Sequence, residues 1–244
     1  MPTVNLLLRS AGRGDETRLW DFYRSTLTET LPVPSVGTIR GSLQRGTLLI
    51  AEEVGSGNIV ATAGYFEYIK SVDGHLVFEL AGTRVTTGKL LPFSLQQILL
   101  AVRLFQIAAT EDQSARPVSI ISSARHKRSK ENLVCAGMSE IAAMPHWMDY
   151  DTYSWAQPSY HAEWSHYIAD CRCIERAIIV LQQVGFEAGT HRCECIRRKG
   201  DGTDECINVD LTYQIPIRAL FRPLLDAQSR GETICALSAL PETL

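Results

Sequence analysis

The chain has 244 residues, of which 45% are hydrophobic and 21% charged, and its formal net charge is −3. These values are typical of a globular protein with one large domain or two small ones. Because Lys and Arg are not in excess, the charge gives no reason to expect a nucleic acid as partner. No run approaches the roughly 18 apolar residues of a membrane helix, and no secretory pattern is visible. We therefore expect a cytoplasmic protein that contacts no membrane.

The first half of the chain predicts one strand, two helices and three further strands. Two prolines and a glycine separate the two helical patterns, and short glycine-containing turns join the later strands. The predicted ranges are 3–9 for the first strand, 16–30 and 38–44 for the helices, and 47–54, 59–69 and 76–85 for the later strands.

A long apolar helix is the main feature of the second half, and a polar loop precedes it. The region at 144–167 is rich in aromatic residues and has little periodicity. The predicted ranges are 94–110, 127–137 and 160–184 for helices, the last most clearly in its second half, and 117–123, 188–198 and 205–213 for strands.

The seven cysteines lack the secretory context in which a disulfide framework is expected. Cys171 and Cys173 fall in a helical pattern and point in different directions, whereas Cys193 and Cys195 fall in a strand pattern and share one face. Zinc sites usually place two residues between such cysteines rather than one. We expect buried thiols and no metal site; a metal-binding regulatory protein remains an alternative.

Over about the first 140 residues, the order strand, helix, helix, three antiparallel strands, long helix, strand, helix resembles the GCN5-related N-acetyltransferase (GNAT) superfamily. The resemblance implies an α+β fold with a mixed, largely antiparallel twisted sheet flanked by helices. Residues 1–143 would form the GNAT-like acyl-CoA-binding core. Residues 144–244 would be a C-terminal α/β extension that completes the sheet or forms a small second lobe. In this superfamily one strand splays from its neighbour, and the pantetheine arm of acyl-CoA enters the gap like an extra strand.

Four segments also resemble arginine N-succinyltransferase, a family with the same core and a C-terminal extension. This resemblance implies acetyl-CoA or succinyl-CoA as co-substrate and a small-molecule amine or amino acid as acceptor. The hairpin at 185–213 either completes the sheet or joins the subunits of a homodimer. The segments are ELAGTRV (79–85), RLFQIAAT (103–110), ERAIIVLQQVGFEAG (175–189) and DECINVDL (204–211).

The loop before the long helix is the expected pyrophosphate site, because a helix start offers unpaired N–H groups and the positive end of the dipole. The superfamily signature there is Arg/Gln-x-x-Gly-x-Gly/Ala, but this chain reads TTGKLLPFSLQQ at 86–97, with one glycine and with Pro92. Asn132 resembles the asparagine that often meets the pantetheine arm. The expected residues that bind the co-substrate are Val85, Thr86, Gly88, Lys89, Ser94, Leu95, Gln96 and Asn132.

Glu79 is the first candidate for a general base, since an amine must be neutral to attack a thioester. It lies in the middle of an apolar strand, where burial would raise the pKa of a carboxyl group toward the working pH. The alternative is that Glu79 points to solvent, and Glu67 is the second candidate. Tyr150 and Tyr153 lie near the place where related enzymes carry a tyrosine acid. His126 is a further candidate for contact with phosphate or substrate.

The sequence therefore predicts an N-acyltransferase that moves an acyl group from acyl-CoA to a small amine or amino acid, by direct attack assisted by a carboxylate base. The alternative is a non-catalytic relative that serves as a binding or assembly subunit. That alternative follows from the loop at 86–97, which departs from the signature of the superfamily.

Overall fold

The structure is a computed structural model, and it describes most of the chain in seven segments. They comprise residues 3–28, 33–67, 76–86, 89–110, 118–141, 164–198 and 201–215, together with residues 226, 229 and 230.

The described strands are β1 (Thr3–Ser10), β2 (Leu48–Glu53), β3 (Ile59–Glu67), β4 (Leu76–Val85), β5 (Lys89–Leu91), β6 (Val118–Ala124), β7 (Ser139–Ile141), β8 (Ser165–Ala169), β9 (Thr190–Arg198) and β10 (Asp204–Gln214). The described helices are η1, a 3₁₀ turn (Arg13–Asp15), α1 (Glu16–Ser25), α2 (Val36–Arg45), α3 (Leu95–Thr110), α4 (Lys127–Cys135) and α6 (Cys171–Gln183).

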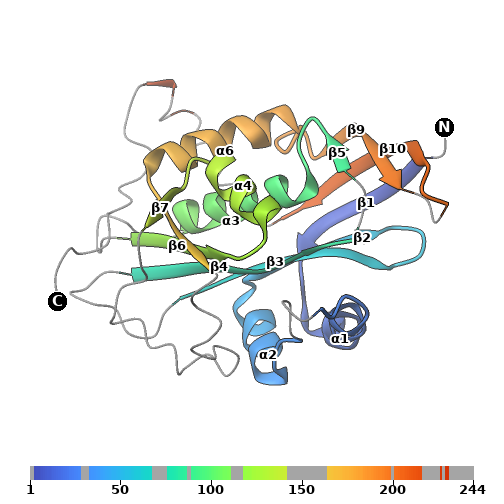
Figure 1. The fold of residues 1–244 in the computed structure, drawn as a ribbon, viewed down its shortest axis with the longest axis horizontal. Helices are drawn as coiled ribbons and strands as arrows, with labels where there is room; N and C mark the ends of the chain where they lie inside the picture. The colour runs from blue at the N-terminus through green and yellow to red at the C-terminus, as the bar shows by residue number, and fades with distance from the viewer. Residues whose placement is uncertain are drawn as a thin grey trace.

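All described strands join one mixed sheet, in the order β5-β9-β10-β1-β2-β3-β4-β6-β8-β7. The pairs β1–β10 and β4–β6 are parallel, and the other pairs are antiparallel. Helices α3, α4 and α6 lie on one face, and α1 and α2 lie on the other (Figure 1). The α+β architecture that the resemblance implies, a mixed and largely antiparallel sheet flanked by helices, is thus confirmed. The domain boundary at residue 143 stays a prediction, although β9 and β10 lie in the same sheet as the N-terminal strands.

Two apolar clusters fill the space between the sheet and its helices. The larger lies between the sheet, α3 and α6, and the smaller between the sheet, α1 and α2. Helix α3 packs against α6 as well as β3 and β4, which explains why its sequence is apolar almost all round rather than on one stripe. Only two charged or amide side chains interrupt its buried run, Arg103 and Gln106, and both are buried.

Local sequence signals account for several helix ends. Ser35 caps α2, because its side chain accepts the N–H of Thr38 at 3.1 Å. Gly46 ends the same helix in the left-handed conformation, with φ +67°, which costs a glycine little. Asp170 caps α6 by accepting the N–H of Arg172 at 3.0 Å.

The prediction of a helix over 160–184 is wrong in its described first half and confirmed in its second. Residues 165–169 form β8, which pairs with the outer edge of β6 and supplies partners for its backbone groups. Helix α6 then begins at Cys171. The short strands β5 and β7 also lie outside the predicted strands, because each is only three residues long and has no room for an alternating pattern.

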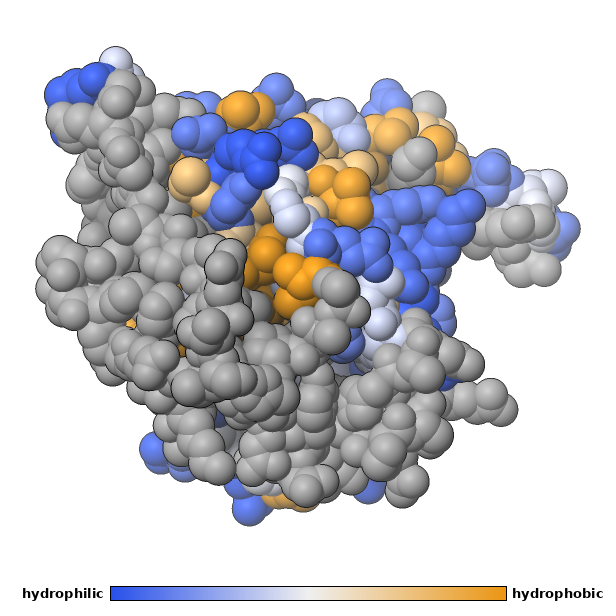
Figure 2. Space-filling view, turned by 60° about the vertical axis from the view of Figure 1, so that its left-hand side comes forward, coloured by the Kyte–Doolittle hydropathy of each residue, from blue (hydrophilic) through white to orange (hydrophobic). Residues whose placement is uncertain are grey.

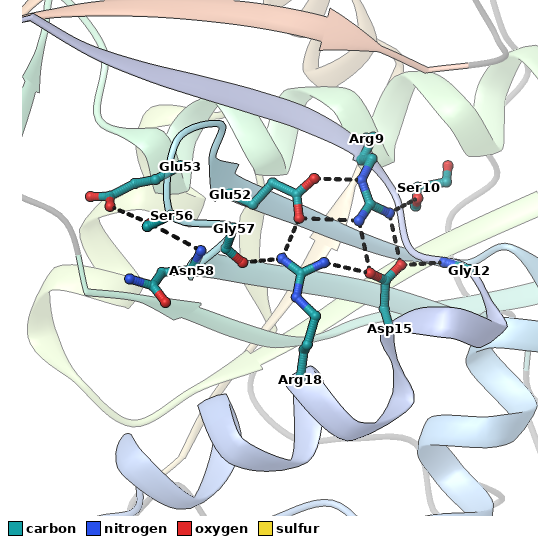
Figure 3. A network of polar contacts seen from close by, with 10 residues as sticks. All are labelled: Arg9, Ser10, Gly12, Asp15, Arg18, Glu52, Glu53, Ser56, Gly57 and Asn58. Atoms are coloured by element: carbon teal, nitrogen blue, oxygen red, sulfur yellow. Dashed lines mark hydrogen bonds and ion pairs between the residues drawn. The ribbon is translucent and has the colours of Figure 1, made fainter.

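Two arginines and two carboxylates tie α1 to β1 and β2 (Figure 3). Arg9 donates to both oxygens of Asp15 at 2.7 and 2.8 Å and to Glu52 at 2.9 and 3.1 Å. Arg18 donates to Asp15 at 2.9 Å and also to Glu52. The hydrogen bonds from Arg9 hold the pKa of Asp15 below its usual 3.8. Burial acts to raise the pKa of Glu52, but hydrogen bonds from Arg9 and Arg18 outweigh it and lower that pKa.

Replacing Asp15 with Asn is expected to lower the free energy of unfolding at pH 7 by about 2 kcal/mol, because the buried Asp15 carboxylate is the shared anionic partner of the partly exposed Arg9 and Arg18. A carboxyl group with a depressed folded-state pKa stabilises the fold above its unfolded pKa, and this contribution is lost as pH falls through the folded pKa. Urea unfolding should therefore show the difference between wild type and variant shrinking as the pH falls from about 5 to about 2.

Glu16→Gln is the matched control, since the ion pair of Glu16 within the described segments is with the exposed Arg40. Its effect should stay below about 1 kcal/mol. If the difference in unfolding free energy between wild type and Asp15→Asn did not change with pH, the charge of the carboxylate would not be what stabilises the contact of α1 with β1 and β2.

Candidate functional site

The pairing between strands β4 and β6 ends halfway along β4. They pair in parallel from Leu76 and Val118 to Leu80 and Ser122, and the Ser122 hydroxyl donates to the Leu80 carbonyl at 3.1 Å. Beyond that pair, the described part of β6 no longer pairs with β4. Just there, Gly82 takes the left-handed conformation with φ +65°, which favours glycine. The sequence therefore builds a gap between two neighbouring parallel strands.

A cavity of about 200 Å³ occupies this gap and is lined from both faces of the sheet. This volume is below the roughly 300–1,000 Å³ of sites that enclose drug-sized ligands. It suits the reactive ends of two substrates better than the whole of a large one. Its wall includes Tyr23 of α1, Ile39 of α2, Glu79 of β4, Arg103 of α3, Ser122 of β6 and Asn132 of α4.

Glu79, the predicted base, lies in β4 between Phe66 of β3 and Ile121 of β6 and lines the cavity. Glu79 is only 8% exposed, which contradicts the alternative that its side chain points to solvent. Glu67 is exposed at the end of β3 and is not part of the cavity wall. Tyr150 and Tyr153 lie outside the described residues.

The first described residues of the predicted phosphate loop are bonded to the sheet and do not line the cavity. The Thr86 amide and hydroxyl both donate to the Val60 carbonyl, at 2.9 and 3.0 Å, so these donors serve the sheet. Lys89 begins β5, whose backbone pairs with β9 at the far edge of the sheet. Gly88 lies outside the described residues. Neither Val85 nor Thr86 is part of the cavity wall.

The start of α3 carries a capping box that consumes part of its anion-binding capacity. The Gln97 N–H donates to the Ser94 hydroxyl at 3.3 Å, and the Ser94 N–H donates to the Gln97 side chain at 2.9 Å. The amides of Leu95 and Gln96 are not engaged in this way. Pro92 precedes the first helical turn, since α3 begins at Leu95.

Of the predicted residues that bind the co-substrate, Gln96 and Asn132 line the cavity, and Ser94 and Leu95 do not. The Gln96 side-chain amide donates to the Ser129 hydroxyl at 3.4 Å and so bridges α3 to α4. Asn132 is 8% exposed. Its Nδ2 is enclosed and has no hydrogen-bond partner within the described ranges, which is unusual for a buried amide.

A basic run leads into the first turn of α4, from Arg125 to Arg128. Arg125 and His126 line the central cavity, and Arg125 also lines a second cavity of about 530 Å³ on the outside of α4. Lys127 and Lys130 line this second cavity as well. His126 provides no side-chain cap for α4. The signal in the sequence was a basic run placed directly between a strand and a helix start.

Two buried arginines on the cavity wall also escaped the sequence prediction. Arg84 is 6% exposed, and it donates to the Tyr23 carbonyl at 3.0 Å while its guanidinium lies 4.8 Å from the Tyr23 ring centroid. Arg103 is 3% exposed and reaches from α3 to the sheet, where it donates to the carbonyls of Gly64 and Ala81. Both bring positive charge to the same cavity as Glu79.

The cysteines have the orientations that their patterns predict. Cys193 and Cys195 are both buried on one face of β9, whereas Cys171 is exposed and Cys173 buried on α6. Burial raises the pKa of Cys173 and of Cys193 to about 11, which disfavours the thiolate form that binds metals. In the described part of the chain, no three His, Cys, Asp or Glu residues gather as metal ligands.

No protein-family model matches the chain, and neither does any curated protein. Among solved structures, it is similar to a mosquito arylalkylamine N-acetyltransferase like 5b, with 12% identity, a TM-score of 0.44, and coverage of 67% of this chain and 99% of that one. It is also similar to a ribosomal-protein-alanine N-acetyltransferase from Brucella melitensis, with 14% identity, a TM-score of 0.44, and coverage of 66% and 96%. A third, a putative acetyltransferase from Salmonella typhimurium with its cofactor acetyl-CoA, has 12% identity, a TM-score of 0.39, and coverage of 67% and 91%.

The described surface outlines no broad apolar face. Figure 2 shows one side of the molecule, on which coloured hydrophobic residues form small patches between hydrophilic ones. The exposed large hydrophobic residues of the described segments come from separate elements, for example Val36 in α2, Val134 in α4 and Ile179 in α6. The homodimer therefore stays a prediction. Within the described ranges, no helix is long and apolar enough to span a membrane.

Asn132→Leu is expected to leave the free energy of unfolding unchanged or to raise it by up to about 1 kcal/mol, because it removes an amide that has no partner in the described structure. Ser122→Ala should instead lower it by about 1 kcal/mol, since the Ser122 hydroxyl does have a partner. Urea unfolding of both variants measures the contrast. A loss for Asn132→Leu that equals or exceeds the loss for Ser122→Ala would mean that the Asn132 amide serves the fold rather than a ligand.

Proposed function

We propose that this protein is an acyl-CoA-dependent N-acyltransferase that acts on a small amine or an amino acid. The observation that carries the proposal is the cavity between β4 and β6, with the buried carboxylate of Glu79 on its wall. A gap between parallel strands gives two substrates access to one point, because it opens the sheet from face to face. A buried acid at that point is suited to receive a proton.

An acyl-CoA would supply a thioester carbonyl that is activated toward amines. Several groups of this chain fit such a co-substrate. The edge of β4 beyond Leu80 no longer pairs with β6, so its backbone is available to an extended ligand arm, as in strand addition. The enclosed Asn132 Nδ2 needs an acceptor, which the amide carbonyls of a pantetheine arm provide.

The phosphates would lie near the first turn of α4 rather than at the start of α3. Arg125, Lys127 and Lys130 surround the outer cavity, with Glu131 as the one acid on its described wall. Arg125 also lines the central cavity, so a ligand arm could pass from one cavity to the other. Cations and uncapped helical amides both favour phosphate groups.

Glu79 would act on the acceptor. Most free amines are protonated at neutral pH, and only the neutral form attacks a carbonyl. We assign Glu79 the removal of that proton, directly or through one water molecule. Its position on the wall of the gap supports this role, and the residue that would protonate the leaving thiolate is left open.

Acetyl-CoA and succinyl-CoA are expected to raise the melting temperature of the protein, because a ligand that binds only the folded state stabilises it by mass action. At a ligand concentration of about 100 times the dissociation constant, the gain is about 2.7 kcal/mol. Differential scanning fluorimetry measures this. The double variant Lys127→Gln/Lys130→Gln should need several-fold more ligand for the same shift. A flat response of the wild type to both compounds would contradict the proposed function.

Glu79→Gln should lower turnover by about 10²- to 10⁴-fold, the usual contribution of a general base, with little change in the dissociation constant for acyl-CoA. Release of free CoA measures turnover, and calorimetry measures binding. The exposed Glu67→Gln is the control and should retain wild-type turnover. Unchanged turnover in Glu79→Gln would remove Glu79 from this role. Tight binding of acyl-CoA without turnover of any tested amine would favour the alternative of a non-catalytic binding subunit.

A further inference from the structure

Arg103 stands out among the polar residues of the cavity, because it is the charged side chain in the middle of an apolar helix. It is 3% exposed and lies in α3, directly between the buried Val102 and Leu104. Its guanidinium nevertheless lines the cavity between β4 and β6. A buried position in an apolar helix usually carries an apolar side chain, so the presence of an arginine there requires an explanation.

The hydrogen bonds of Arg103 leave one nitrogen unused. Nε donates to the Leu99 carbonyl at 3.2 Å, and Nη1 donates to the carbonyls of Gly64 at 2.9 Å and Ala81 at 3.2 Å. A guanidinium has five N–H groups, and these three bonds use those of Nε and Nη1. The two N–H groups of Nη2 make no hydrogen bond within the described part of the chain. Nη2 is also absent from the fully enclosed polar atoms without partners, and Arg103 lines the cavity, so we infer that Nη2 faces it.

The described residues also supply no counter-ion for the charge of Arg103. No carboxylate of the described residues forms an ion pair with it. Burial alone lowers the pKa of Arg103 to about 9, without any contribution from Glu79 on the same cavity. Arg9 is the contrast within this protein, because its hydrogen bonds to Asp15 raise its pKa. A buried charge without a counter-ion is costly, and three carbonyl dipoles solvate the cation without neutralising it.

We propose that Arg103 binds a carboxylate carried by one of the two substrates. A carboxylate would take both N–H groups of Nη2 and supply the missing negative charge. It has two sources, the free end of a dicarboxylic acyl donor or the carboxylate of an amino-acid acceptor. The proposal rests on the proposed function and deepens it, since it states which chemistry the central cavity selects.

Succinyl-CoA and butyryl-CoA test the donor as the source. Their acyl chains both have four carbons, and they differ in a terminal carboxylate against a methyl group. If Arg103 reads the donor, calorimetry should show that wild type binds succinyl-CoA at least tenfold more tightly than butyryl-CoA. In Arg103→Gln this ratio should fall to about one, while the dissociation constant for butyryl-CoA changes less than threefold. Arg103→Lys keeps the charge and should keep part of the preference.

Pairs of acceptors test the other source. Lysine and cadaverine, arginine and agmatine, or ornithine and putrescine differ by one carboxylate. If Arg103 reads the acceptor, wild type should show a lower KM for the amino acid of a pair than for its amine. Arg103→Gln should then raise the KM for the amino acid at least tenfold and leave the KM for the amine nearly unchanged. A purely structural role would weaken both members of a pair alike.

The outcomes separate this proposal from the proposed function. Suppose that wild type binds succinyl-CoA and butyryl-CoA equally and has equal KM values within every acceptor pair. That result would contradict the binding of a carboxylate by Arg103, but it would leave the proposed acyltransferase activity intact. A preference that survives in Arg103→Gln would contradict the binding of a carboxylate by Arg103 as well. Absence of binding by any acyl-CoA removes the proposed function and this proposal with it. Arg192→Gln is the control for loss of a positive charge, because Arg192 lies exposed on β9 and pairs with Asp210; it should change no ratio.

Discussion

The site depends on one feature of the sheet, which is that β4 and β6 stop pairing after Leu80 and Ser122. A strand that leaves its neighbour exposes backbone groups, and those groups need partners when they are buried. Here the register of β3 and β4 also shifts next to Gly64. Arg103 donates to the carbonyls of Gly64 and Ala81 at this point. One side chain of α3 thus satisfies the irregular backbone and brings a positive charge to the gap that the irregularity creates.

The start of α3 is less suited to anions than the start of α4. Ser94 and Gln97 satisfy each other's amides, which stabilises the helix without any ligand. Helix α4 has no side-chain cap, and basic residues surround its first turn. A loop without the usual glycines therefore does not by itself argue against a phosphate-bearing ligand, because a second helix start with cations lies beside the same cavity.

Long or strongly patterned segments of the fold could be predicted from the sequence. Strand β4 has the predicted bounds, and α3 differs from its prediction by one residue. Both are buried over most of their length, so their apolar runs are unambiguous. The strands β5 and β7 are too short to carry a pattern. Residues 165–169 form a strand because they pair with the edge of β6. That edge lies more than 40 residues earlier in the chain, so the sequence around 165–169 does not indicate the pairing.

The site was less predictable, because its charges do not follow the motif that the superfamily supplies. Glu79 could be found as an acid in an apolar strand, and its burial fits that interpretation. Arg103 breaks an apolar helix in the same manner, yet in the sequence it looks like an interruption of a hydrophobic run. The physical argument is identical for both residues, since a charge in a buried, otherwise apolar element needs compensation.

Glu79 and Arg103 bring a carboxyl group and a guanidinium group to the wall of one cavity. Burial is the sole cause of the lowered pKa of Arg103, and no ion pair with a carboxylate of the described residues offsets the cost of enclosing its charge. Under the proposed function, a carboxylate on a substrate would offset that cost, whereas a simple amine carries no group that could do so. The carboxylate that we propose for Arg103 would therefore distinguish this cavity from one built for amines alone, through a residue of α3 rather than through the loop that precedes it.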